Sequence, residues 1–525
     1  MEKKITKKMS RFTALFFGIN YIIGIGFVMT IGQLYSFLGL WFILALFLVS
    51  TIAYSVGISY AVIVRNYPNS YSGGYIVTRR AFGKKVGLLN VWSSYIQSPI
   101  LAVVSIAGIV WTFQGTEIYN NFKWLIILGA ALLFFLIIWI MNHGFNSSKW
   151  LVFILSSLKW LVILGVLIFA TIYFFYSLHN IEGVCNRLVN PPHLKGLSFL
   201  NICSATSLIF FCFGGIEGIS VINAEVENPK KVVPWAIMTT VIIGFIIYVL
   251  FFIFMLNALG PSGKNSLNPT DAIDPNPINS LIATFGVGTF ATIGTIFLWI
   301  AIPSQIANKA TLRIQAAWVQ TRNLLVLTID GVFPRYFAKV NKHSQFSRCV
   351  WLDSIICFVF IAFFVIISLL NNSYAERLES SLNAASLTFI MMYMTSTLAI
   401  LKEYKNKSID LSKIELIIVV YATIGIAFLA FSLVYPVVVI TMNSTKIEDI
   451  VVAWLPYIFF IPLLMIGFIL NFISNKYFSN EKFPTSFVDY VRENPDLKLY
   501  QYFPEGDLHP LAKQIKNDIA KPQCE

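Results

Sequence analysis

Apolar runs of about 20 residues recur along this chain and constrain its fold more strongly than any other feature. Twelve such runs lie between residues 12 and 474. A helix of about 20 apolar residues is long enough to cross the roughly 30 Å of hydrocarbon in a bilayer. The composition agrees, because 57% of the 525 residues are hydrophobic and only 12% are charged. We therefore predict an all-α polytopic membrane protein with twelve transmembrane helices, and the composition excludes a soluble globular protein.

The basic residues divide unevenly between the two sides of this predicted topology. With the amino terminus cytoplasmic, the inner loops hold 24 Lys and Arg residues and the outer loops hold six. This bias is the positive-inside pattern of integral membrane proteins. It predicts a multi-pass protein of the cell (plasma) membrane with both termini cytoplasmic. It also accounts for the net charge of +13 without a nucleic acid partner.

The predicted topology divides the chain into three regions. Residues 1–11 are expected to form a cytoplasmic amino terminus, residues 12–474 a twelve-helix domain, and residues 475–525 a cytoplasmic tail. An eighth span is expected at about 278–306. The basic segment 309–348 that follows is expected to be cytoplasmic and to form an interfacial helix and a loop.

The remaining polar residues do not indicate catalysis or a bound cofactor. The six cysteines show no paired spacing, and the five histidines fall in predicted loops or in the tail. We therefore expect no disulfide and no metal site. The pair Gly73-Gly74 lacks the Lys-Ser/Thr of a phosphate loop, which argues against a nucleotide site. The chain is predicted not to be an enzyme and to need no cofactor.

Glycines interrupt the sixth apolar run, within LIFFCFGGIEGISVINAEVENPKKVVP at residues 208–234. Gly214, Gly215 and Gly218 stand beside the carboxylate of Glu217. Each glycine weakens a helix by about 1 kcal/mol relative to alanine. An opened membrane helix leaves backbone groups that hydrocarbon cannot satisfy, so the break survives only inside protein or beside a cavity. We interpret the stretch as a discontinuous helix that forms half of a substrate site.

The first apolar run holds a second glycine cluster, formed by Gly18, Gly24 and Gly26. Breaks in the first and sixth spans point to a transporter made of two inverted repeats of five helices, with its site near the middle of the membrane. The alternative is that these glycines only allow close packing of neighbouring helices.

Four segments resemble the amino acid-polyamine-organocation (APC) superfamily, and in particular its amino acid permeases. They are IIGIGFV at 22–28, YPNSYSGGYIVTRRAFG at 67–83, FFCFGGIEG with AEVENPKKVVPWAI at 210–218 and 224–237, and the segment that contains Arg322, Asp330, Gly331 and Pro334. The resemblance covers nearly the whole chain except the tail. It implies a five-plus-five inverted repeat of the LeuT-like kind with discontinuous helices 1 and 6.

The resemblance also implies which groups bind a substrate. The backbone amides around Gly24, Ile25 and Gly26 would face the carboxylate of an amino acid, since helix amino ends carry partial positive charge. The family has a small residue at the position of Ile25. Carbonyl oxygens would face the substrate ammonium, and these belong to Ile22, Phe211, Cys212 and Gly214. The Phe211 side chain matches the family's aromatic gate over bound substrate.

Two ionisable residues fall inside predicted spans. A charged Glu217 would cost about 2.5 to 3.5 kcal/mol or more in hydrocarbon. It is therefore a substrate-binding group, a proton carrier, or an acid hydrogen-bonded between helices. By resemblance, the Lys159 ammonium substitutes for a sodium ion between spans 1, 5 and 8, which implies a sodium-independent carrier. The alternative for Lys159 is a lysine that binds carbonyl groups and has no part in coupling.

We therefore expect a secondary active transporter, either a permease or an exchanger (antiporter), that moves amino acids by alternating access. Its partners would be an amino acid and the lipid bilayer, with coupling to protons left open. The alternatives are a polyamine carrier of the same fold and a transporter-like amino acid sensor that signals through its tail. The sequence does not identify the amino acid or the oligomeric state.

Overall fold

The computed structural model of the chain describes residues 9–23, 34, 38, 41–68, 71–113, 117–143, 145–177, 198–258, 291–338, 341, 346–371 and 374–478. Over these ranges the secondary structure is helical apart from turns, loops and one bridge between Met9 and Val226. The predicted all-α class is therefore confirmed.

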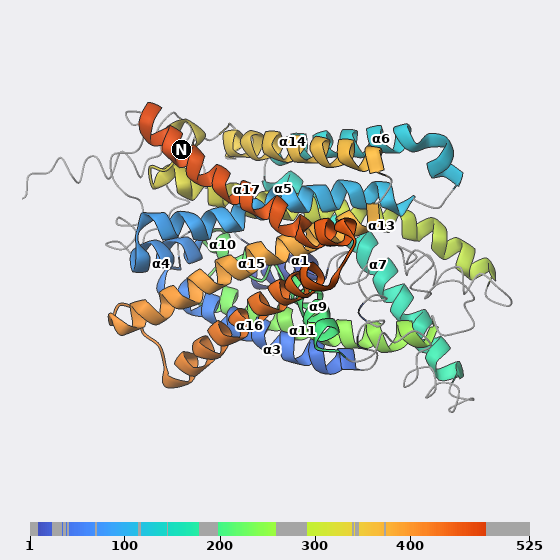
Figure 1. Cartoon of the computed structure of the whole chain (residues 1–525), viewed down its shortest axis with the longest axis horizontal. Helices are drawn as coiled ribbons and strands as arrows, with labels where there is room; N and C mark the ends of the chain where they lie inside the picture. The colour runs from blue at the N-terminus through green and yellow to red at the C-terminus, as the bar shows by residue number, and fades with distance from the viewer. Residues whose placement is uncertain are drawn as a thin grey trace, which may run out of the picture.

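Long helices form the body of the molecule (Figure 1). The α-helices are α1 (Arg11–Ile22), α3 (Trp41–Asn66), α4 (Gly73–Phe82), α5 (Lys84–Thr112), α6 (Glu117–Asn142), α7 (Phe145–Ser177), α9 (Phe199–Cys212), α10 (Gly218–Val221), α11 (Pro229–Ala258), α13 (Ala291–Ile329), α14 (Ser347–Asn371), α15 (Tyr374–Lys405), α16 (Lys413–Asn443) and α17 (Ile447–Tyr477). Two short 3₁₀ helices, η2 (Asn223–Glu225) and η4 (Arg335–Ala338), follow α10 and α13.

Within the described ranges, seven helices are long and apolar enough to cross a membrane: α3, α5, α6, α11, α15, α16 and α17. The protein is thus an integral membrane protein by the composition of its helices. The count of twelve spans stays a prediction.

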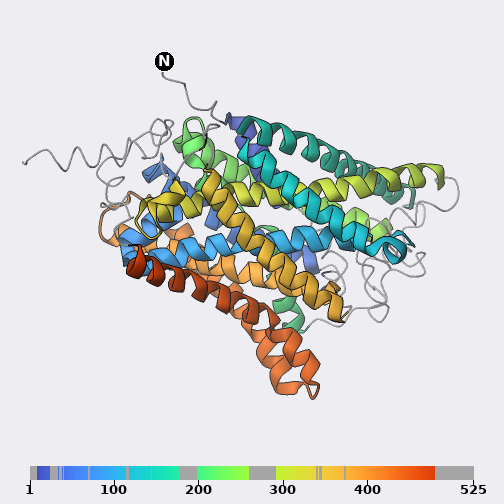
Figure 2. The same cartoon turned by 90° about the horizontal axis from the view of Figure 1, so that it is seen from above.

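The helices pack as a bundle whose members run mostly along its long axis (Figure 1). α5 packs against α13, α14 and α15, while α3 packs against α11 and α16. α6 and α14 lie side by side along the upper edge of the bundle (Figure 1), and the hairpin of α16 and α17 projects from the bundle (Figure 2).

Burial separates the central helices from the peripheral ones. The most apolar window of α5 is 100% buried, whereas that of α17 is only 22% buried. A helix that exposes an apolar surface is unstable in water but stable in lipid. α5 therefore lies in the protein interior, and α17 presents its apolar side chains to the bilayer.

The prediction of an interfacial helix in the first half of residues 309–348 was wrong. α13 is continuous from Ala291 to Ile329, and residues 309–328 are buried except for Leu312. Its polar side chains, which include Arg313 and Arg322, bind polar partners on other helices. A hydropathy pattern cannot distinguish such interior polar residues from a cytoplasmic surface, and this explains the error.

Candidate functional site

The candidate site centres on the turn that follows α9. α9 ends at Cys212, residues 213–217 form turns, and α10 begins at Gly218. Gly215 has a φ of +100°, a conformation that side-chain-bearing residues rarely adopt. A Cβ atom at Gly215 would also lie 2.1 Å from the Tyr21 ring of α1. This position therefore requires glycine, both for the turn and for the close approach of α1.

Tyr248 of α11 joins the carboxyl ends of α1 and α9. Its hydroxyl oxygen lies 2.9 Å from the carbonyl oxygen of Ile22 and 2.8 Å from that of Cys212. The hydroxyl has one proton, so it donates to one of these carbonyls at a time. Each carbonyl oxygen has two lone pairs and can accept a further donor. The structure thus brings together two of the carbonyls that were expected to face an ammonium group.

Phe211 and Gly214 lie at the same turn. The carbonyl oxygen of Phe211 accepts a hydrogen bond from the Gly214 N–H at 2.9 Å. The Phe211 side chain is half-buried and packs among apolar side chains of α1, α5, α13 and α15. A Cβ atom at Gly214 would lie 2.2 Å from the Phe389 ring, so α15 packs closely against the turn. The Phe211 ring therefore lies between the helices that surround the turn.

Glu217 is fully buried at the end of this turn. Its Oε2 atom accepts hydrogen bonds from the Tyr393 hydroxyl of α15 and from the Gly215 N–H, the latter at 3.1 Å. Its Oε1 atom has no hydrogen-bond partner among the described residues. The Gln97 amide of α5 interacts with Glu217 but lies outside hydrogen-bonding geometry. One carboxylate oxygen is therefore held in place, and the other can accept a hydrogen bond.

Lys159 lies where α1, α7 and α13 meet. Its side chain is buried, and its ammonium donates to the carbonyl oxygen of Asn20 at 2.9 Å. The Asn20 side chain donates to Gln315 of α13 at 3.2 Å, and Gln315 donates to the Phe17 carbonyl at 3.1 Å. In the part of the chain that the structure describes, no carboxylate forms an ion pair with Lys159. Neutral carbonyl and amide groups surround this ammonium.

Consecutive residues of α1 connect these two places. Asn20 contacts Lys159, and Tyr21 packs against the turn that holds Glu217. The remaining predicted binding residues, Gly24, Ile25 and Gly26, lie outside the described residues.

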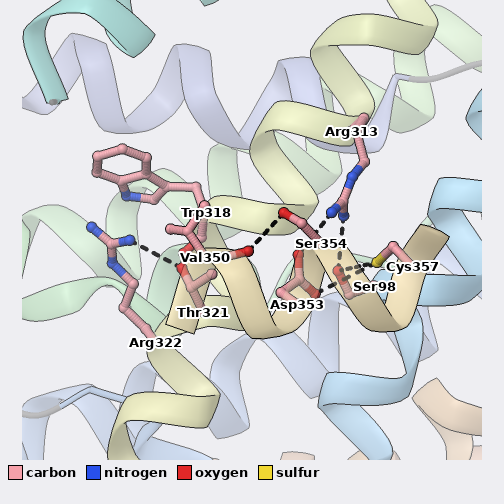
Figure 3. Close-up of polar contacts among 9 residues, drawn as sticks. All are labelled: Ser98, Arg313, Trp318, Thr321, Arg322, Val350, Asp353, Ser354 and Cys357. Carbon is pink, nitrogen blue, oxygen red and sulfur yellow. Dashed lines mark hydrogen bonds and ion pairs between the residues drawn. The ribbon is translucent and has the colours of Figure 1, made fainter. Parts of the chain in front are cut away.

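A second buried polar cluster links α5, α13 and α14 (Figure 3). The Arg313 guanidinium lies 2.7 Å from Asp353 Oδ2 and donates to Ser98 Oγ at 2.9 Å. The Cys357 thiol lies 3.6 Å from the other Asp353 oxygen. Both charged side chains are almost fully buried, so each compensates the desolvation of the other.

A third cluster joins the chain before α1 to the segment after α10. Glu225 pairs with Arg322 of α13 at 2.8 Å and accepts from Trp318 Nε1 at 3.1 Å. The Met9 N–H donates to the Glu225 carbonyl at 2.9 Å. The Arg322 guanidinium also lies 4.0 Å from the Trp318 ring centroid. We call Met9, Glu225, Trp318 and Arg322 the Glu225 cluster.

Several residues at the site could not be identified from the sequence, namely Asn20, Tyr21, Gln97, Tyr248 and Tyr393. Each lies within a predicted span and outside the motifs that carry the family resemblance. The chain has 23 tyrosines, and no motif distinguishes these three from the others. Only their three-dimensional contacts identify them.

Comparisons with known proteins identify the family of this chain. A family model described as amino acid permease matches residues 9–469. The low-affinity putrescine importer PlaP of Escherichia coli is 25% identical over 292 residues, which cover 53% of this chain and 57% of the importer. The aspartate-proton symporter of Bacillus subtilis is 22% identical over 366 residues, which cover 66% of this chain and 65% of the symporter. The matches thus span less than two thirds of each of these relatives.

A solved structure shows the same fold. MhsT in complex with L-phenylalanine superposes with a TM-score of 0.57 at 13% identity, covering 80% of this chain and 97% of MhsT. The likeness establishes a LeuT-like arrangement of helices. The matching family and the two named relatives are transporters rather than enzymes. Because the family model matches most of its length, the chain belongs to the amino acid permease family.

Proposed function

We propose that the chain is a secondary active transporter that carries an amino acid across the plasma membrane by alternating access. One observation supports this most directly: the last carbonyls of α1 and α9 share the Tyr248 hydroxyl in the protein interior. We interpret the ends of α1 and α9 as the breaks of discontinuous first and sixth helices, related by an inverted repeat. Membership of the amino acid permease family supports the substrate class.

The proposed binding mode uses the backbone at both breaks. The substrate ammonium binds the carbonyl oxygens of Ile22 and Cys212, with further contacts from Phe211 and Gly214. The carboxylate binds the amides around Gly24–Gly26. Both polar ends of the amino acid are thereby matched without a charged side chain.

Lys159 supports independence from sodium. Its side-chain nitrogen donates to the Asn20 carbonyl, and the Asn20 amide donates to Gln315, so a basic group joins α1, α7 and α13. A sodium ion at this place would lie beside a like charge and would be repelled. We therefore propose transport that needs no sodium, either as exchange or with proton coupling.

Glu217 has two roles that are compatible with its contacts. Its Oε1, which has no hydrogen-bond partner among the described residues, can accept a hydrogen bond from a substrate ammonium or from a proton donor. Its other oxygen is fixed by Tyr393 and Gly215. Binding and release of a proton at Oε1 would couple amino acid transport to a proton gradient. The relative named as an aspartate-proton symporter supports this role.

A polyamine carrier is the second candidate. It is supported by the relative named as a putrescine importer and by Glu217 as a buried carboxylate for an amine. A polyamine has no carboxylate, however, so it would leave the amides around Gly24–Gly26 without a ligand. A third candidate is a sensor that binds an amino acid without moving it.

The topology is part of the proposal. Residues 12–474 form the transporter, and residues 1–11 and 475–525 lie in the cytoplasm. Protease digestion of sealed right-side-out and inside-out vesicles tests this placement, because a cytoplasmic tail is cut only in the inside-out vesicles.

Reconstitution tests the function itself. A thermal-shift screen against amino acids and polyamines identifies the ligand, since a ligand stabilises the folded state that binds it. Uptake of the labelled ligand into proteoliposomes then separates a transporter from a sensor. Ligand binding without flux would support the sensor, and stabilisation by polyamines alone would support the second candidate.

A pair of glycine variants tests the site. We expect Gly26→Leu to abolish uptake in protein that remains folded. Gly129→Leu in α6 is the control, because a Cβ atom at Gly129 meets nothing within 4 Å. Full uptake by Gly26→Leu would contradict the assigned site.

A further inference from the structure

A groove with a volume of about 280 Å³ opens between α1, α7 and α13. Its walls are mainly apolar, and phenylalanine is the commonest lining residue, at Phe12, Phe16, Phe17 and Phe153. Phe12 and Phe153 are 76% and 53% exposed, so the groove opens toward the surroundings of the bundle. None of its lining residues belongs to the turn after α9 or to the proposed substrate-binding residues.

The chemistry of the groove favours an apolar ligand. Its polar lining side chains include Thr13 and Gln315, and Gln315 already bonds to α1. A bound water needs two to four polar partners, and apolar cavities of about 150 Å³ remain dry and bind apolar molecules. For an exposed apolar groove on an integral membrane protein, the abundant apolar molecule is a lipid.

Charge near the groove selects the kind of lipid. Phe12 lines the groove and also packs edge-on against Trp235, with ring centroids 6.5 Å apart. Arg11 holds its guanidinium 3.8 Å from the same Trp235 ring. The eight residues before Met9 include four lysines. Basic groups beside a membrane surface attract anionic head groups by about 1 kcal/mol each.

The amino-terminal segment is a poorer occupant than a lipid. The sequence MEKKITKK has only Met1 and Ile5 as large apolar residues, so it cannot cover a phenylalanine-lined groove.

Three residues of the groove also hold α1 in place. Met9 and Trp318 belong to the Glu225 cluster, and both line the groove. Gln315 bonds to Phe17 and to Asn20, the residue that binds Lys159. A ligand in the groove therefore contacts the residues that keep α1 against α13.

We propose that the groove between α1, α7 and α13 binds one acyl chain of an anionic phospholipid, with the head group at Arg11. Bound lipid stabilises the arrangement in which α1 is docked on α13. The effect on transport rests on the proposed function, whereas lipid binding does not.

Native mass spectrometry of the full chain tests the binding. The protein is released from nanodiscs that contain phosphatidylglycerol or phosphatidylcholine. The expected result is one phosphatidylglycerol retained per protein. Val152→Trp fills the groove and should remove contacts with about two methylene groups of the acyl chain. Its retention of the lipid should therefore fall about tenfold. Leu132→Trp, on the exposed face of α6, is the matched control and should retain the lipid.

Charge variants test the head-group contact. Arg11→Gln should lower the preference for phosphatidylglycerol over phosphatidylcholine, whereas Lys405→Gln should not. Equal retention by wild type and Val152→Trp would overturn the groove as the lipid site. Higher retention after deletion of residues 1–8 would show that the amino terminus occupies the groove and would also overturn the proposal. A protein that binds lipid here but moves no amino acid would refute the proposed function alone.

Discussion

The ammonium of Lys159 lies 2.9 Å from the carbonyl oxygen of Asn20, and no carboxylate pairs with it among the described residues. This contact places a positive charge against the end of α1, one residue before the tyrosine that packs on Gly215. The acceptor is a backbone carbonyl, so its position is set by the conformation of α1. The charge and the candidate substrate site are therefore linked through two consecutive residues.

Lys159→Met should lower uptake by about tenfold or more. The substitution leaves the Asn20 carbonyl without its donor, which should destabilise the transport-competent arrangement of α1 by about 1 to 3 kcal/mol. A change of about 1.4 kcal/mol lowers the population of that arrangement about tenfold. Tyr457→Phe is the control, because the Tyr457 hydroxyl has no hydrogen-bond partner in the described part of the chain. Initial uptake rates check this, and a wild-type rate in Lys159→Met would remove Lys159 from the mechanism.

Tyr248→Phe should destabilise the protein by about 1 to 3 kcal/mol, because two buried carbonyls lose their shared donor. It should also change KM for the substrate, since the same carbonyls are proposed to bind the ammonium. Tyr54→Phe is the matched control, as its hydroxyl makes only a 3.6 Å contact to a methionine sulfur. Thermal unfolding in detergent gives the change in stability, and uptake kinetics give KM. A stability loss with an unchanged KM would mean that these carbonyls are structural.

Glu217 and Tyr393 should be energetically coupled. In a double-mutant cycle of Glu217→Gln and Tyr393→Phe, the expected interaction free energy is about 0.5 to 3 kcal/mol. The pair Glu217→Gln and Tyr421→Phe shares no partner in the structure and should be additive within about 0.5 kcal/mol. Chemical or thermal unfolding of the four proteins provides the measurement. If the effects of Glu217→Gln and Tyr393→Phe are additive, the hydrogen bond between these two side chains does not contribute to stability.

Removing one partner of the buried Arg313–Asp353 pair should destabilise the protein strongly, whereas replacing both partners by apolar residues should destabilise it little. Arg313→Met alone leaves an unpaired carboxylate in the interior and should cost about 3 to 5 kcal/mol. The double variant Arg313→Met/Asp353→Leu should recover most of that loss. Arg65→Met breaks an exposed pair with Glu415 and should cost only about 0 to 1 kcal/mol. If the double variant is as unstable as Arg313→Met, the loss of stability does not come from an unpaired Asp353 carboxylate, and the prediction is wrong.

The sequence was sufficient for the class of fold and for the position of the turn after α9. Apolar runs predict membrane helices because hydrocarbon requires a minimum length, and Gly214–Gly218 marks the turn because glycine interrupts helices. α9 ends at Cys212, two residues before the first of these glycines. The family was also correctly identified, since its motifs are local in sequence.

The interior polar contacts could not be predicted in the same way. Arg313 and Arg322 were assigned to a cytoplasmic segment, because a charged side chain in hydrophobic surroundings is usually unfavourable. Their partners, Asp353 and Glu225, are 40 and 97 residues away in sequence. A pairing across such separations depends on helix packing, and a single sequence contains no signal for it.

Sodium-free uptake into proteoliposomes tests the central claim most directly. The measurement follows a labelled amino acid, chosen as the strongest stabiliser in the thermal-shift screen, with all sodium replaced by choline. The account predicts uptake or exchange at the same rate as in sodium, and a loss of uptake in Gly26→Leu. Ligand-induced stabilisation with no flux, or flux that stops when sodium is removed, would contradict it.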